Sequence, residues 1–213
     1  MIFELVFAIK RYSKARIGNA NHSLRIKDMT KKVLDPQTIL FPLPAAMVSC
    51  QHKDDRPNII TLAWVGVVCS EPPMVGIAVR KNRFSYDIIS KSKAFVVNVP
   101  KGDQLKATDF CGTHSGRDVD KFAQTKLTAV PGEKTKAPLI AECPVNLECV
   151  VMQEMELGSH TLFIGEIVAT HIDSEYLDEK GHLDVDKMKL FCYCPKAHEY
   201  RSIGDVLAQY GGA

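Results

Sequence analysis

The sequence predicts a mainly β fold with inserted helices, arranged as an antiparallel barrel. Short stretches rich in Val, Ile and Thr recur at short intervals, which is typical of strands. Helical periodicity appears only after the third or fourth of these stretches, whereas an alternating parallel sheet would place a helix between successive strands. The 213 residues, of which 46% are hydrophobic and 24% charged, suit one domain with a single sizeable core.

The first half of the chain supplies four strands and one helix. Prolines mark the entry to a first strand within Thr38–Cys50, and the charged stretch Lys53–Pro57 between two apolar runs indicates a hairpin turn. Asn82 suits an N-cap, and the apolar residues that follow it share one helical face. The remaining strands are expected at Asn58–Trp64, Gly66–Ser70 and Met74–Arg80, and the helix at Phe84–Ser90.

The second half adds a core strand, two short helices and a long hairpin. Ala94–Val99 is a continuous apolar run ended by Pro100, as in a strand that is buried on both faces. The apolar residues of Tyr200–Tyr210 lie at helical spacing. Helices are expected at Asp103–Phe110 and Asp118–Ala123, strands at Val145–Glu156, His160–Ile172 and Lys189–Tyr193, and loops at 111–116, Val130–Lys136, Leu157–Ser159 and Leu177–Lys187.

Charge divides the chain near residue 28. Residues 1–28 hold six basic and two acidic side chains, a net +4, so the remainder of a chain of net +2 carries −2. A weakly negative main domain argues against nucleic-acid binding. The apolar run at the N-terminus is too short to cross a membrane, and its charges follow the run, unlike those of a signal peptide. We therefore expect a cytoplasmic protein with one domain at residues 29–213.

The N-terminal extension, residues 1–28, has three interpretations. It is a disordered extension, the product of a start codon assigned too early, or a helix that packs on a partner subunit. Its composition, apolar at first and then basic, is compatible with each of them.

Seven cysteines in a chain without an export signal are expected to be reduced thiols. Cys192 and Cys194 are two residues apart, which on a strand would direct both thiols to one face. Two buried structural thiols are the simpler interpretation of this pair, and a metal or redox role is the alternative. No metal site is otherwise expected.

The stretch Arg56–Tyr86 contains the candidate binding site. Its end gathers cations and hydroxyl groups where a strand meets a helix N-terminus, and unpaired amides and the helix dipole would add to their charge. This pattern predicts a phosphate site, while Trp64, the only Trp in the chain, can cover a flat ring. A core tryptophan and a solvated helix start are the simpler interpretations, but neither explains both features within one stretch. We therefore favour a nucleotide-like cofactor.

Several further motifs occur in an order and spacing that together are specific. They are Phe41–Pro44, Arg56-Pro-Asn-x-x-Thr-x-x-Trp64, Pro72-Pro73, Phe95–Pro100, Asp109–Gly112 with Ser115-Gly116, Asp120–Phe122, and Gly158-x-His-x-x-Phe-Ile-Gly165. From about Leu34 onward the chain resembles the flavin reductase-like, FMN-binding split-barrel family, and within it the flavoredoxin type. The resemblance implies a split β-barrel and a homodimer in which each subunit completes the other's flavin site. The tail after Tyr200 is a candidate for reaching across.

The resemblance also implies FMN as the cofactor. Backbone groups of Asn58–Trp64 would then bond the pyrimidine edge of the flavin, and the side chains of Arg80, Lys81 and Ser85 would hold the phosphate. Ser85 stands where a Thr is common in the family, which keeps the hydroxyl group. The expected cofactor-binding residues are Asn58, Thr61, Leu62, Ala63, Trp64, Val79, Arg80, Lys81, Ser85 and Tyr86.

Two further segments carry open alternatives. His160 matches a turn that lies near the nicotinamide site of related flavin reductases, although Ser159 replaces the usual acid, so it is either a catalytic residue or a surface imidazole. Cys111, His114 and Ser115 match a loop that the family places near the cofactor. A Cys–His dyad and a structural loop are both compatible with that spacing.

Sequence motifs for other chemistries are absent, since the chain has no Gly-x-Gly-x-x-Gly, P-loop or His-Glu-x-x-His. FMN supplies redox chemistry itself, so the protein must hold it, tune it and exclude water. Two functions remain open: an oxidoreductase that receives electrons from NAD(P)H or from a protein donor such as ferredoxin, and an FMN-binding electron carrier without turnover. An interaction module that has lost the cofactor is disfavoured, because Asn58, Thr61, Trp64 and Arg80 are all present.

Overall fold

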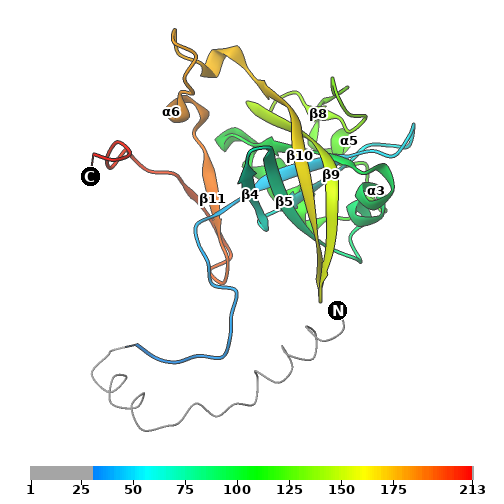
Figure 1. Cartoon of the computed structure of the whole chain (residues 1–213), viewed down its shortest axis with the longest axis horizontal. Helices are drawn as coiled ribbons and strands as arrows, with labels where there is room; N and C mark the ends of the chain where they lie inside the picture. The colour runs from blue at the N-terminus through cyan, green and yellow to red at the C-terminus, as the bar shows by residue number, and fades with distance from the viewer. Residues whose placement is uncertain (1–30, 213) are drawn as a thin grey trace. The chain divides into compact units, whose positions relative to one another are not determined.

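The computed structural model describes residues 31–212, which fall into two units. Residues 31–38, the described part of the first unit, are exposed and form neither helix nor strand. All the helices and strands below belong to the second unit, which begins at Ile39 (Figure 1). The extension expected at residues 1–28 lies outside the described residues, so the boundary at 28/29 stays a prediction.

The main sheet has seven antiparallel strands, in the order β3-β2-β6-β9-β10-β5-β4. It curls into an open half-barrel (Figure 1), which confirms the predicted mainly β split barrel. A backbone hydrogen bond of 2.9 Å from Ala78 N to Trp64 O fixes the β3–β4 connection against β5. The strands are β2 (Ala46–Cys50), β3 (Asn58–Leu62), β4 (Val65–Ser70), β5 (Pro73–Arg80), β6 (Ala94–Val99), β9 (Val145–Leu157) and β10 (His160–Ile172).

Two small sheets accompany the main one. One is a pair of two-residue strands, β7 (Ala129–Val130) and β8 (Leu139–Ile140). The other has the order β1-β11-β12, where β1 (Leu43–Pro44) pairs with β11 (Phe191–Cys194), and β11 pairs with β12 (Glu199–Ser202). The β11–β12 hairpin therefore joins the C-terminal part of the chain to the entry of the barrel.

Side chains of β2 alternate between two apolar cores. Val48 packs with Ile77 and Phe95 in one core, to which the helix α3 (Phe84–Ser92) contributes Ile89. Met47 faces the other core, to which the helices α4 (Leu105–Thr113) and α5 (Lys121–Thr125) contribute Cys111 and Phe122. Because both faces are covered, the central strands are apolar along most of their length, as the run Ala94–Val99 predicted.

The three helices expected after residue 80 are present in the structure as α3, α4 and α5, but their ends differ from the prediction. Arg83, with an extended backbone, is the N-cap of α3, so the prediction of Asn82 was wrong; the Asn82 carbonyl instead accepts a hydrogen bond from Arg117. The short 3-10 helix η1 (Gly102–Gln104) precedes α4, which continues beyond Phe110 to Thr113, where the backbone N–H of His114 donates to Phe110 O at 3.0 Å. Residues 111–113 are thus helical rather than loop. The described residues also contain η2 (Ser174–Tyr176) and the single turn α6 (Val185–Met188), which begins inside the predicted loop Leu177–Lys187.

The predicted helical spacing of Tyr200–Tyr210 was wrong. Residues 199–202 form β12, in which Tyr200 faces Tyr193, and residues 203–208 form neither helix nor strand. The turn between β11 and β12 contains two residues in the left-handed conformation, Lys196 (φ 69°) and His198 (φ 56°), which close the hairpin. Strand pairing therefore overrode the local pattern.

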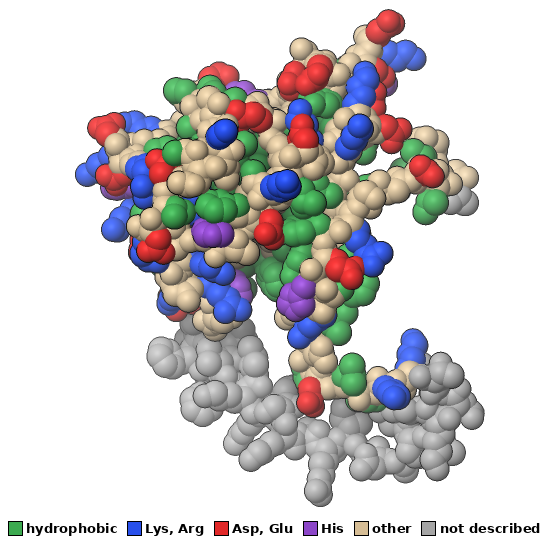
Figure 2. All heavy atoms as spheres, turned by 180° about the vertical axis from the view of Figure 1, so that it is seen from behind, with side chains coloured by type: hydrophobic (Ala, Val, Ile, Leu, Met, Phe, Trp, Pro, Cys, Tyr) green, Lys and Arg blue, Asp and Glu red, His purple; other side chains and the backbone are tan. Residues whose placement is uncertain are grey.

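Large apolar side chains stay exposed on two strands of the main sheet. Val67 and Val68 lie on the edge strand β4, and Met152 and Met155 lie on the far half of β9. Figure 2 shows hydrophobic side chains that reach the surface between charged ones on the face turned away in Figure 1. No helix among residues 31–212 is long and apolar enough to cross a membrane.

Candidate functional site

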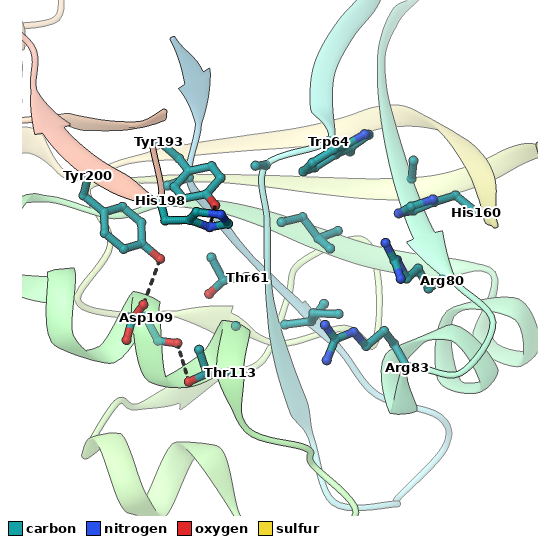
Figure 3. A pocket seen from close by; sticks show the side chains of 16 residues that line it. Thr61, Trp64, Arg80, Arg83, Asp109, Thr113, His160, Tyr193, His198 and Tyr200 are labelled. Atoms are coloured by element: carbon teal, nitrogen blue, oxygen red, sulfur yellow. Dashed lines mark hydrogen bonds between the residues drawn. The ribbon is translucent and has the colours of Figure 1, made fainter. Parts of the chain in front are cut away.

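Two adjoining cavities lie where β3, β5 and α4 meet. The large cavity has a volume of about 540 Å³ and the small cavity about 100 Å³, and both are lined by Ile60, Arg83 and Gly112. Figure 3 shows the large cavity with side chains from β3, β5, α4, β10 and the β11–β12 hairpin turned toward it. A single elongated ligand can therefore occupy both cavities.

Trp64, His160 and Arg80 form one wall of the large cavity (Figure 3). The Trp64 and His160 rings stack with their centroids 6.0 Å apart and their planes at 12°. His160 opens β10 after a two-residue turn in which only Gly158 has positive φ (67°), a type II′ pattern that favours glycine. Burial, together with the charge of Arg80, lowers the pKa of His160, which favours the neutral imidazole. This wall offers aromatic faces beside one fixed cation.

The opposite wall consists of Asp109 from α4 and three residues of the β11–β12 hairpin (Figure 3). The Tyr200 hydroxyl donates to Asp109 Oδ1 at 3.2 Å, and burial, with the charge of Asp109, raises the pKa of Tyr200 to about 12. Tyr193 Oη and His198 Nδ1 are 3.5 Å apart. None of these four was predicted as a site residue. The strained backbone of His198, whose side chain lines the cavity, is a signal that only a structure supplies.

The small cavity is strongly cationic. Arg83 and Lys121 line it, and none of its lining residues in the described chain is Asp or Glu. Lys121 is only 3% exposed, and its ammonium group donates to Ile59 O and Cys111 O, both at 2.7 Å. An ammonium group has three N–H donors, so one remains for a ligand. Burial lowers the pKa of Lys121 to about 8, and the charge of Arg83 acts in the same direction.

The N-terminus of α3 also opens on the small cavity. Ser85 is buried there and its hydroxyl accepts a 2.7 Å hydrogen bond from Asn58 Nδ2. In the described part of the chain, no side chain caps the first-turn amides of this nine-residue helix. Uncapped amides at the positive end of a helix dipole attract an anion, as do two nearby cations. The small cavity therefore fits a phosphate group.

The predicted site residues divide into three groups. Thr61, Leu62, Ala63, Trp64, Arg80 and His160 line the large cavity, and Asn58 and Ser85 line the small one. Val79, Lys81 and Tyr86 line neither: Val79 is fully buried, Lys81 pairs with Glu156 at 2.6 Å, and Tyr86 packs edge-on against Phe163. The Thr61 hydroxyl is itself engaged, since it donates to Thr108 O at 2.5 Å. Arg83 and Lys121 are the cations of the small cavity that the predicted set did not include.

The contacts of Cys111 and His114 favour a structural role over a Cys–His dyad. Burial raises the pKa of the Cys111 thiol to about 11, which keeps it protonated near neutral pH. The His114 ring stacks on Phe110 at 3.9 Å, and its Nδ1 lies 3.1 Å from Thr113 Oγ1. Both residues nevertheless line the small cavity with Ser115.

Cys192 and Cys194 lie on β11, and both residues are half-buried. Burial, reinforced by the neighbouring Cys194, raises the pKa of Cys192. Within residues 31–212, no group of three or more His, Cys, Asp or Glu is placed to hold a metal ion.

A split barrel with an anion pocket joined to an aromatic-walled cavity defines a protein suited to a phosphorylated planar cofactor. Comparison with known sequences specifies the class. Residues 38–191 match the model of the flavin reductase like domain. The chain therefore belongs to the flavin reductase-like family, a class of flavin-related oxidoreductases and electron-transfer proteins.

Individual relatives agree with this assignment. The structure is similar to the flavoredoxin of Desulfovibrio vulgaris (Miyazaki F), with 36% identity, a TM-score of 0.81, and coverage of 86% of this chain and 98% of that one. It is also similar to the flavoredoxin of Methanosarcina acetivorans, with 32% identity, a TM-score of 0.78, and coverage of 84% and 95%. The sequence is 35% identical over 129 residues to the NADH-dependent FAD reductase of Streptomyces globisporus, covering 60% of this chain and 69% of the relative.

Proposed function

We propose that the chain binds FMN across the two cavities and passes electrons from NAD(P)H, or from a protein donor such as ferredoxin, through this flavin. The observation that carries the proposal is the small cavity, in which Arg83 and Lys121 converge without a carboxylate among the described lining residues. A phosphate monoester supplies the anion that this charge requires. The large cavity beside it has the volume and the aromatic wall that a three-ring system needs.

Each part of FMN has residues of this chain to hold it. Ser85, Arg83, Lys121 and the first-turn amides of α3 bind the phosphate, and the backbone of residues 61–64 bonds the edge of the ring system. Arg80 lines the large cavity but not the small one. We therefore place Arg80 beside the flavin ring and the chain attached to that ring, whereas the sequence analysis expected it on the phosphate. FMN supplies hydride and single-electron transfer when bound, while the protein orients it and excludes water.

His160 is proposed to contact the second substrate. It stands beside Trp64 and Arg80 on one wall, where its lowered pKa keeps the imidazole neutral. A neutral ring next to a cation can accept or donate one hydrogen bond without competing for the phosphates of a nicotinamide nucleotide. Its role is therefore positioning of the donor rather than charge neutralisation.

A homodimer is the proposed assembly. An edge strand such as β4 exposes unpaired backbone groups, and here it also exposes Val67, which is 74% accessible, and Val68. Apolar residues on the far half of β9, which β10 and β5 separate from β4, are exposed as well. Contact with a second copy would remove these side chains from water and narrow the mouth of the flavin site.

Anaerobic titration with NADH, and then with NADPH, separates the two functions that remain. An oxidoreductase of this type is expected to be yellow and to bleach at a rate that saturates with nucleotide concentration. An FMN-loaded protein that both nucleotides leave oxidised, but that dithionite bleaches, would support the carrier or a protein donor. Failure to take up any flavin would contradict the proposed function.

A further inference from the structure

One arginine fastens the two sides of the small cavity to each other. The cavity lies between the start of α3 and the loop of residues 114–117. Arg117 Nη1 donates to Asn82 O at 3.0 Å, and its Nη2 lies 3.5 Å from Asp87 Oδ2. Its guanidinium carbon sits 5.4 Å from the centre of the Phe84 ring. We call the contacts of Arg117 with Asn82 O and with the Phe84 ring the clasp.

The same loop is fixed from its inner side. Arg56 Nη2 donates to Gly116 O at 2.6 Å. A Cβ atom added to Gly116 would lie 2.0 Å from Asn58 Oδ1 and 2.8 Å from the Phe84 ring, so the backbone there touches the residues that form the cavity wall. Held by Arg56 on one side and by the clasp on the other, the loop leaves only about 100 Å³.

A cavity of this size, with one wall held by the clasp, can discriminate between flavin nucleotides. A phosphate monoester places three free oxygens inside the cavity, where they can meet Arg83, Lys121 and the α3 amides. A diphosphate has one oxygen that bridges to the second phosphate, and the chain beyond it must leave the cavity. One wall of the small cavity is formed where the 114–117 loop meets the start of α3, and Arg117 connects these two segments.

We propose that the Arg117 clasp makes the site selective for FMN over FAD. This inference rests on the proposed placement of the flavin phosphate in the small cavity. Arg117 does not line that cavity itself. It acts by holding shut the wall through which the adenosine half of FAD would have to pass, so it is a specificity-determining residue that need not touch FMN.

The test is the ratio of dissociation constants for FAD and FMN, with riboflavin as the reference, measured by quenching of flavin fluorescence. Wild-type protein is expected to bind FMN about tenfold more tightly than FAD, since opening the clasp breaks a charge-assisted hydrogen bond. Arg117→Ala and Arg117→Lys should both bring the ratio close to one and leave riboflavin unaffected. Lysine keeps the positive charge but cannot form the same bridge.

Asp87→Asn is the matched control. It removes the charge of the ion pair but keeps the bond from Arg117 to Asn82 O and the contact with Phe84, so its ratio should stay near that of wild type. The inference is overturned if wild-type protein binds FAD as tightly as FMN, or if both Arg117 variants keep the wild-type ratio. If Arg117→Ala does not fold, the ratio in Arg117→Lys decides. A protein that binds none of the three flavins would contradict the proposed function itself.

Discussion

Lys81 and Lys121 show where the site residues predicted from the sequence differ from those that line the cavities in the structure. Lys81 is next to Arg80 in the chain and therefore entered the predicted phosphate set, but its ammonium group pairs with Glu156 and lines neither cavity. Lys121 belongs to α5, yet its ammonium group lies buried in the small cavity. Only the packing of α4 and α5 against β3 brings it there, and a local pattern contains no sign of that contact.

Replacing Lys121 by Met should weaken FMN binding about tenfold or more, because a hydrogen bond to a charged group contributes about 1.5–3 kcal/mol. Riboflavin affinity should change little, and Lys81→Met is the matched control that should leave both affinities unchanged. Since the pKa of Lys121 is about 8 in the free protein, FMN affinity should also fall as the pH rises through that value. Equal FMN affinities in the two variants would contradict the assignment.

At the scale of elements, Glu148 fastens a loop to the sheet. This fully buried carboxylate of β9 accepts hydrogen bonds from Glu133 N, Thr135 N and His171 Nε2, at 2.8, 2.7 and 2.7 Å. Burial alone would raise the pKa of Glu148. The bonds from His171 and from the loop amides outweigh it and lower the pKa to about 2. The loop after β7 and the strand β10 are thereby held by one anion.

The free energy of unfolding should therefore decrease as the pH is lowered from about 4.5 to about 2. Glu148 has a lower pKa in the folded protein than in the unfolded chain, so its contribution is complete above the unfolded value and disappears as the pH falls toward the folded value. Glu148→Gln should lower the free energy of unfolding at pH 7 by about 2 kcal/mol and flatten its decline in acid. Urea denaturation at several pH values measures both, and an unchanged acid slope would contradict the role of Glu148.

The elements themselves were largely predictable. Alternation and β-branched runs located the seven strands of the main sheet, because every one of them except the exposed edge strand β4 contributes buried side chains. The β11–β12 hairpin was missed because its turn uses Lys196 and His198 in left-handed conformations, which sequence rules reserve for Gly and Asn. As a result, one wall of the large cavity could be predicted and the wall containing Tyr193 and Tyr200 could not.

At the scale of the whole molecule, the site is assembled from segments far apart in the chain. The stretch around Trp64, the turn before His160, the helix α5 and the C-terminal hairpin meet only when the sheet curls. Motif order was enough to indicate the split barrel and the family, since both follow from the spacing of strands and turns. It could not indicate which cations converge, because that depends on tertiary packing.

The fluorescence of Trp64 during titration with FMN shows whether a flavin ring lies against the aromatic wall of the large cavity. Trp64 is the only Trp in the chain, so its emission reports on the large cavity alone. We expect quenching that saturates at one FMN per chain, together with flavin binding that persists in Trp64→Phe. Unchanged Trp64 emission at saturating FMN, in protein shown to be folded, would contradict the placement of a flavin ring against this wall.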